Sequence, residues 1–184
     1  METVFNVTRE KMTKTLSVLK TDFDSIRAGR ANAAVLDKIH VDYYGSSMPI
    51  NQLATVAVAE ARILTIQPWD SSVLPLIEKA IQASDLGINP QNDGRIIRLT
   101  FPQPTEERRK QLVKDVSKMG EDAKIALRKV RRDAIEKLKT MKKNSEITED
   151  DLKDGENEIQ KITDEFVKKV DEAVAAKEKE IMEI

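Results

Sequence analysis

The chain has 184 residues and a net charge of -1; charged residues make up 34% of it and aromatic residues 4%. This composition favours long solvated helices over a large globular core. The absence of cysteine excludes a disulfide framework, a thiolate metal site and a cysteine nucleophile. The sequence has no signal-peptide pattern at its start and no run of about 20 apolar residues, so we expect a cytoplasmic protein without a membrane span.

The distribution of proline predicts long helices at both ends of the chain. All six prolines lie between residues 49 and 104, and proline costs a helix interior roughly 3 kcal/mol. Apolar residues in the first segment recur at steps of three, four and seven, the pattern of a helix in a bundle. They are Phe5, Met12, Leu16, Leu19, Phe23 and Ile26. Gly29 stands where this helix would place a left-handed C-terminal residue.

Two further helices are predicted after Pro104. The first spans 105–144 with Thr105 as its N-cap, and its apolar stripe is Val116, Met119, Ala123, Ala126, Val130, Ala134, Leu138 and Met141. The second begins near Thr148, and Asp151, three residues on, resembles a capping box. Its apolar stripe is Leu152, Ile159, Ile162, Phe166, Val170 and Ala173. The three helices together predict an elongated three-helix bundle.

The middle of the chain has the period of strands. Segments 39–43, 55–58, 62–66 and 95–101 read as strands, and a helix capped by Asp70 or Ser71 carries Pro75 in its first turn. The predicted fold class is therefore α+β, with a bundle of residues 1–30 and 104–184 and an inserted small β/α/β domain of residues 31–103. Two covalent links join them side by side and predict a hinge at Arg30, Ala31, Gln103 and Pro104.

No catalytic, metal or cofactor site is predicted. His40 is the only histidine, and no glycine-rich phosphate loop follows any strand. Tyr43 and Tyr44 point to opposite sides of a strand, so at least one belongs to the core. Trp69 is interpreted as packing the small domain.

The charge is divided unevenly between the last two helices. Residues 104–144 carry 14 Lys and Arg against 7 Asp and Glu, whereas residues 145–184 carry 6 against 14. At 100° per residue, one arc of the second bundle helix holds Lys124, Arg128, Arg131 and Arg132. The charge alone does not distinguish between two interpretations: attraction between neighbouring helices, or a basic face that binds a polyanion. Guanidinium groups fork onto phosphates, so such a face would contact phosphates and RNA shape rather than base sequence.

Several motifs, in order along nearly the whole chain, resemble one family. They are Arg27-Ala28-Gly29-Arg30-Ala31, Asp42-Tyr43-Tyr44-Gly45, Gln52-Leu53-Ala54, Lys79-Ala80-Ile81, Ala83-Ser84-Asp85-Leu86-Gly87 with Asn89-Pro90, Thr105-Glu106-Glu107-Arg108-Arg109-Lys110 and Val130-Arg131-Arg132-Asp133-Ala134. On these motifs the chain resembles the ribosome recycling factors.

The resemblance implies both a shape and an activity. Members of the family set the bundle and the small domain as an L, in the outline of a tRNA. They are not enzymes: the monomer binds the post-termination ribosome, with its bundle against large-subunit ribosomal RNA. Elongation factor G then uses GTP to split the subunits and release the mRNA.

Particular residues follow from the same resemblance. Arg109, Arg128 and Arg131 match arginines at the RNA contact, and Arg132 and Arg27 are further candidates. The chain departs from the family pattern at Pro104, which stands in place of an aliphatic residue. Because proline fixes φ and removes a donor, it narrows the mobility expected of the hinge.

Two other classes of function stay open. A coiled-coil adaptor would explain the apolar repeat of the long helices, and it predicts a stable homo-oligomer. A general RNA-binding protein would explain the basic face. An enzyme of RNA metabolism would need a site that the sequence does not offer.

Overall fold

The computed structural model describes residues 1–26 and 29–183. Arg27 and Ala28, which belong to one of the predicted motifs, and Ile184 lie outside the described residues. The chain divides into two compact units, Met1–Arg27 with Glu106–Glu183, and Ala28–Thr105. The first unit is helical and the second contains the strands, so the α+β class is confirmed.

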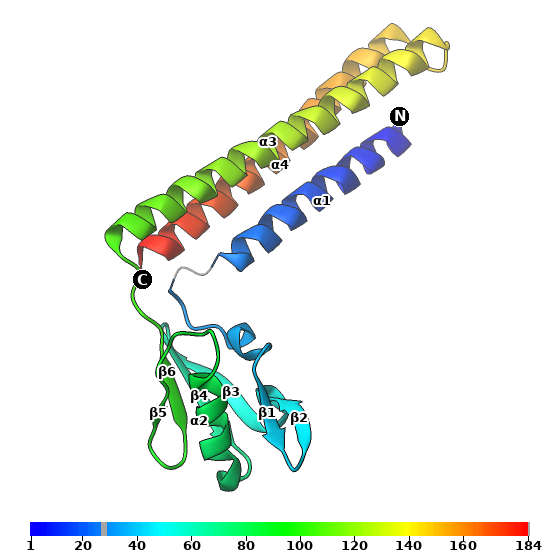
Figure 1. The fold of residues 1–184 in the computed structure, drawn as a ribbon. Coiled ribbons are helices and arrows are strands. Elements are labelled where there is room, and N and C mark those ends of the chain that lie inside the picture. Colours follow the sequence, from blue (N-terminus) through cyan, green and yellow to red (C-terminus); the bar gives the residue numbers. More distant parts are fainter. Residues whose placement is uncertain (27–28, 184) are drawn as a thin grey trace. The chain divides into compact units, whose positions relative to one another are not determined.

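The described part of the first unit consists of the helices α1 (Glu2–Ser25), α3 (Glu106–Lys143) and α4 (Glu149–Met182) (Figure 1). All three predicted helices are therefore present. The predicted capping box is also present, because Thr148 N donates to Asp151 Oδ2 at 2.9 Å and Asp151 N donates to Thr148 Oγ1 at 3.1 Å. The bond that the Asp151 carboxylate accepts from the Thr148 backbone is the main cause of its lowered pKa, and the Thr148 hydroxyl adds to the effect.

The expected role of Gly29 at the end of α1 is wrong. The helix ends at Ser25, and its C-cap, Ile26, is extended, with φ -76° and ψ 109°. Gly29 does have a positive φ of 81°. A Cβ there would lie 2.5 Å from Pro104 Cδ, so this glycine serves a close approach of the two linkers.

The buried stripe of α3 is turned further toward α4 than the sequence predicted. Leu112 and Leu127, which the predicted stripe omits, are buried, whereas Met119, Ala126 and Val130 are only half-buried. The reason is that α3 makes its most extensive contacts with α4 and keeps an open groove toward α1. The predicted stripe of α4 is buried as far as Val170, and Ala173 is half-buried.

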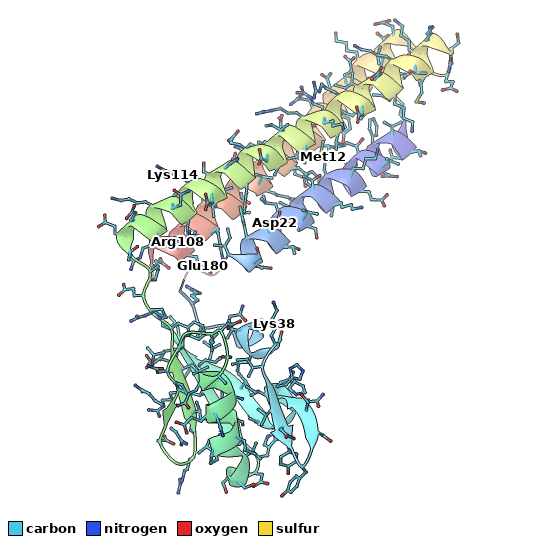
Figure 2. All side chains as sticks on the ribbon, viewed as in Figure 1. Met12, Asp22, Lys38, Arg108, Lys114 and Glu180 are labelled. Carbon is cyan, nitrogen blue, oxygen red and sulfur yellow. The ribbon has the colours of Figure 1, made fainter. Side chains whose placement is uncertain are left out.

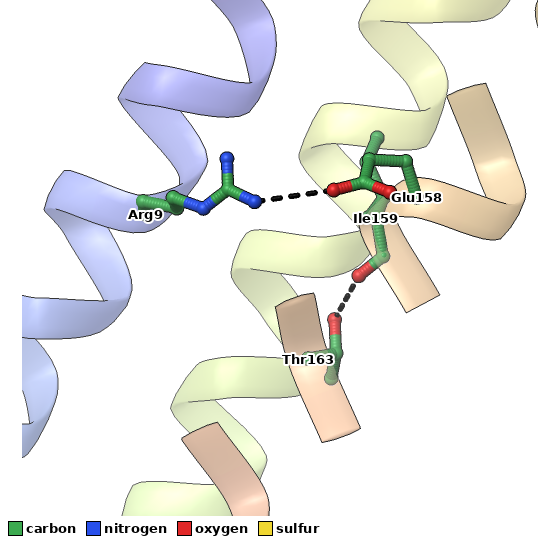
Figure 3. Close-up of polar contacts among 4 residues, drawn as sticks. All are labelled: Arg9, Glu158, Ile159 and Thr163. Carbon is green, nitrogen blue, oxygen red and sulfur yellow. Dashed lines mark hydrogen bonds and ion pairs between the residues drawn. The ribbon is translucent and has the colours of Figure 1, made fainter. Parts of the chain in front are cut away.

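Polar groups on the apolar helix faces are satisfied locally. The buried hydroxyl of Thr163 donates to the carbonyl of Ile159 in its own helix at 2.8 Å (Figure 3). Figure 3 also shows Arg9 of α1 paired with Glu158 of α4. Arg9 Nη2 and Glu158 Oε1 are 3.1 Å apart. This ion pair is partly exposed, so it contributes at most about 1 kcal/mol. The packing of α1 therefore depends mainly on its buried apolar residues, such as Met12 and Leu19.

Two glycines allow α3 and α4 to pack closely. A Cβ on Gly120 would lie 2.5 Å from Val174 Cγ2, and one on Gly155 would lie 2.8 Å from Leu138 Cδ1. Gly120 is on α3 and Gly155 is on α4, so each helix supplies one close approach. Glycine is a poor helix former, and its presence at position 120 in the middle of α3 is therefore explained by packing.

The second unit contains two sheets. The hairpin β1 (His40–Tyr43) and β2 (Ser46–Pro49) forms one, and β3 (Ala54–Glu60), β4 (Ile63–Pro68), β6 (Ile97–Thr100) and β5 (Gln91–Asn92) form an antiparallel sheet in that order. The sequence did not predict β2 or β5. The first is polar and ends in proline, and the second has two residues, so neither carries the alternating apolar pattern on which the prediction depends.

Helix α2 (Leu74–Gln82) completes this unit. Asp70 caps the short 3-10 turn Ser71–Val73 that leads into it, with Ser72 N donating to Asp70 Oδ1 at 3.0 Å. Pro75 lies in the first turn, as predicted. The core joins Ile77 and Ile81 of α2 to Leu64, Ile66, Ile97 and Leu99 of the sheet.

The interpretation of Trp69 as a packing residue is wrong. Its side chain is 68% exposed, and Nε1 donates to Thr55 Oγ1 at 3.0 Å. Along β4 the even-numbered Leu64 and Ile66 are buried in the core, so the alternation of a strand directs residue 69 to the opposite side. Tyr43 packs against the core and Tyr44 is exposed, which agrees with the expectation for this pair.

The replacement Gly120→Ala tests the close approach of α3 and α4. We expect a loss of about 1 kcal/mol in the free energy of unfolding, because the overlap with Val174 outweighs a gain in helix propensity of about 1 kcal/mol. In a Val174→Ala background the same replacement is expected to stabilise. Urea unfolding of the four proteins measures both effects. Equal changes in the two backgrounds would contradict this role of Gly120.

Candidate RNA-binding face

Three arginines of helix α3 lie on a side that faces neither the core nor the recesses toward α1. Arg128 and Arg132 are exposed, and Arg131 is half-buried. We call these three residues the arginine face. Figure 2 draws the side chains along the helix and labels Arg108 and Lys114 nearer its start. The structure thus brings three of the predicted arginines together.

Arg131 is held by a neutral partner on α4. Its Nη1 donates to Gln160 Oε1 at 3.0 Å. The amide of Gln160 in turn donates from Nε2 to Asp164 Oδ1 at 2.8 Å. Among the described residues, Arg131 has no carboxylate in ion-pair contact, and its buried Nε has no acceptor. The side chain is therefore oriented while its positive charge is not cancelled.

Lys124 shares the arc but differs in its partners. Its Nζ lies 2.5 Å from Asp171 Oδ1 on α4 and 3.4 Å from Glu121 Oε1. The hydrogen bond to Asp171 is the main reason that the pKa of Lys124 is raised above 10.5, and Glu121 adds to it. The side chain is only 18% exposed. Lys124 is thus already paired within the bundle.

The arginine face opposes the stability of its own helix. Arg131 and Arg132 lie three and four residues after Arg128, so the repulsion is centred on Arg128; Lys124 is paired with Asp171, and Arg132 has Glu136 four residues on. Like charges at these spacings destabilise a helix by roughly 0.2–0.5 kcal/mol per pair. Among the described residues, neither Arg128 nor Arg132 has an ion-pair partner. An arrangement that opposes stability in this way indicates a function for the charge.

The other predicted RNA-binding residues are not part of this face. Arg109 is half-buried, and 19 residues of helix, about 28 Å, separate it from Arg128. Its Nε is buried without an acceptor among the described residues. Arg27 lies outside the described residues.

The predicted hinge residues lie close together at one end of the second unit. Ala31 N donates to Ala61 O at 2.8 Å, and Phe101 N donates to Arg62 O at 2.7 Å. Both links therefore attach to the turn between β3 and β4. Pro104 packs against Gly29, as described above. Arg30 and Gln103 each have partners as well.

The recesses of the two units differ in character from the arginine face. An open groove of about 510 Å³ runs between α1 and α3. Its lining is mainly apolar and also includes Lys11, Lys14, Asp22 and Asp122. A second recess, of about 500 Å³, lies beside Trp69 in the other unit and includes Asp37. Neither has the excess of positive charge that would select a polyanion.

Two other kinds of feature are absent from the described residues. They contain no cluster of three or more His, Asp or Glu residues that could hold a metal ion. None of the described helices is both long and apolar enough to cross a membrane.

Comparison with known proteins identifies the family. The family model described as "Ribosome recycling factor" matches residues 19–182. The chain belongs to this family. The "Ribosome-recycling factor" of Acetivibrio thermocellus is 61% identical over 95% of this chain and 96% of its own. That of Clostridium tetani is 58% identical over the full length of both chains.

Solved structures of ribosome recycling factors resemble this chain over its whole length. The solution structure of one such factor is 39% identical, with a TM-score of 0.68, and the match covers 100% of this chain and 97% of that one. A second structure contains models of the T. thermophilus ribosome recycling factor and E. coli elongation factor G bound to the E. coli post-termination complex. Its match is 46% identical, with a TM-score of 0.59, and covers 98% of this chain and 97% of that one.

The replacement Arg128→Gln tests whether the arginine face carries unrelieved repulsion. We expect the free energy of unfolding to rise by a few tenths of a kcal/mol in low salt, because Arg128 has like charges at three and four residues. The gain should shrink in high salt, where the charges are screened. Arginine and glutamine have similar helix propensities, so propensity is nearly constant.

The matched control is Lys161→Gln on α4. Lys161 is exposed, and Glu158, Asp164 and Glu165 lie three or four residues from it. Its removal should therefore destabilise the protein slightly in low salt. Chemical unfolding at two salt concentrations measures all three proteins. Equal losses for both variants would show that Arg128 is not in a repulsive field.

Proposed function

We propose that this chain binds the post-termination ribosome and, with elongation factor G and GTP, promotes its separation into subunits and the release of the mRNA. The observation that carries the proposal is the family match across nearly the whole chain. A member of the same family has been placed on the post-termination complex together with elongation factor G. The bundle would supply the ribosome-binding surface.

The contact with large-subunit ribosomal RNA is assigned to the arginine face. Guanidinium groups make bidentate hydrogen bonds to phosphates, and Arg128 and Arg132 are exposed without ion-pair partners among the described residues. Aromatic residues that could stack on bases are absent from the described α3. The contact would therefore read the position of phosphates and the shape of the RNA. Arg109 and Arg27 would extend this contact toward the start of α3 and the end of α1.

The protein would act mechanically, as a non-enzymatic factor in the cytoplasm. The nucleotide would be bound and hydrolysed by elongation factor G, not by this chain. Helices of 38 and 34 residues packed along each other make a stiff body. The linkers at Arg30, Ala31, Gln103 and Pro104 would act as the hinge through which the bundle of residues 1–30 and 104–184 is joined to the domain of residues 31–103. Force delivered to that domain would then reach the ribosome through the bundle.

Light scattering of post-termination ribosomes tests the activity. Mixing them with this protein, elongation factor G and GTP is expected to produce a fall in scattering as the subunits separate. The fall should require all three components, and omission of each one is the control. No fall, with an elongation factor that is active in translocation on the same ribosomes, would contradict the proposed function.

Salt dependence of binding tests the arginine face. Arg128→Gln and Arg131→Gln should each weaken binding to large ribosomal subunits. The slope of log K against log salt is negative, and each variant should make it less steep by about one, the effect of one lost phosphate contact. Subunits of Clostridium acetobutylicum, whose own factor is 59% identical, suit the assay. Lys161→Gln on α4 is the control and should leave the slope unchanged. An unchanged slope for both arginine variants would exclude phosphate contact at this face.

A further inference from the structure

The pairing of α3 with α4 distinguishes between cations that the sequence presents as equivalent. Lys124 and Arg131 are seven residues apart, so they lie on the same side of α3 and both point toward the flank of α4. Each meets one α4 side chain there. The partner of Lys124 is the carboxylate of Asp171, and that of Arg131 is the amide of Gln160.

We propose that Gln160 is a positioning residue for RNA binding: it holds Arg131 without cancelling its charge, while Asp171 cancels the charge of Lys124. Helix α4 thereby decides which cations of α3 can take up a phosphate. This inference rests on the proposed function and adds a residue from the acidic helix to it.

The composition of α4 makes the neutral residue at position 160 informative. Residues 145–184 carry 14 acidic side chains against 6 basic ones. Glu156, Glu158, Asp164 and Glu165 all lie within five residues of Gln160. A carboxylate at 160 would be as large as the amide and would accept the same hydrogen bond. It would also form an ion pair with Arg131, which a phosphate would have to displace.

The orientation of the amide is fixed by a second contact. The ionised carboxylate of Asp164 has no proton to donate and can only accept hydrogen bonds. The NH₂ group of Gln160 therefore faces it, with Nε2 donating to Asp164 Oδ1 at 2.8 Å. Its oxygen is then directed to Arg131 at 3.0 Å. A flipped amide would place its NH₂ group against the guanidinium, where no hydrogen bond can form. Asp164 therefore keeps Gln160 in the orientation that holds Arg131.

The bond to Gln160 uses one of the five N–H donors of the guanidinium. The Nε donor is buried, and the remaining Nη donors are those that could fork onto a phosphate. Residues 158 and 160 are separated by about 200° around the helix. Since Glu158 is engaged with Arg9 of α1, Gln160 lies on the flank of α4 away from α1. Nothing from α1 therefore competes for Arg131.

Two reciprocal replacements test the inference by the salt dependence of binding to large ribosomal subunits of Clostridium acetobutylicum. Gln160→Glu is expected to make the slope of log K against log salt less steep by about one, as is expected of Arg131→Gln. The reason is that the new carboxylate forms an ion pair with Arg131 and neutralises its charge. The double variant should have the slope of Arg131→Gln alone. Asp171→Asn is expected to make the slope steeper by less than one, because Lys124 then keeps only its longer contact, 3.4 Å, with Glu121 and can exchange it for a phosphate.

The control is Asn6→Asp on α1, an exposed amide that becomes an acid and changes the net charge by the same amount. It should leave the slope unchanged, which separates local pairing from a general effect of net charge. Circular dichroism checks that each variant is as helical as the parent protein. The salt slope is a suitable readout because a merely structural defect would lower the affinity at every salt concentration and leave the slope unchanged.

The outcomes separate this inference from the proposed function. An unchanged slope for Gln160→Glu, when Arg131→Gln makes it less steep, would overturn the role of Gln160 and leave the arginine face intact. Equal slopes for Asp171→Asn and the parent protein would overturn the masking of Lys124. No effect of Arg131→Gln itself would instead contradict the RNA contact on which the inference depends.

Discussion

The close antiparallel packing of α3 on α4 is the constraint on which the rest of the bundle depends. It is possible because Gly120 and Gly155 leave room for Val174 and Leu138. Once these contacts set the register, the partners along the flank follow, since Lys124 must meet Asp171 and Arg131 must meet Gln160. The same packing turns the buried stripe of α3 toward α4 and leaves its contact with α1 as an open groove. The packing of the two helices therefore determines which charged groups meet on this flank.

Electrostatics then divides the cations of α3 into two kinds. A net charge of -1 hides a basic helix beside an acidic one. Of the two interpretations that charge alone left open, attraction between the helices applies to Lys124, and a basic face for a polyanion stays a proposal for the arginines. Lys124 is used for attraction between the helices, whereas Arg128 and Arg132 project without such partners among the described residues. Because screening is weaker for partly buried pairs than for exposed charges, the ion pair of Lys124 suits a structural role and the exposed arginines suit a salt-sensitive contact.

The fold could be predicted from the sequence to a large extent, and the site only in part. The confinement of proline to residues 49–104 and the period of the apolar residues are local signals, and they predicted all three long helices. Strands β2 and β5 were not predicted because they are short and lack alternation, and Trp69 was misassigned because its side depends on the strand before it. Of the arginines, the arc from 128 to 132 could be found by helical geometry alone, since it lies within a little more than one turn.

The sequence by itself determined the family, the α+β class, the helices and the arginines that share one side of α3. These depend on spacing along a single segment, which fixes direction around a helix axis. Only the tertiary structure decided which of those cations are already paired. Asp171 lies 47 positions after Lys124 and Gln160 lies 29 after Arg131. No periodicity links such distant residues, because the register of two helices is set by how their side chains interlock.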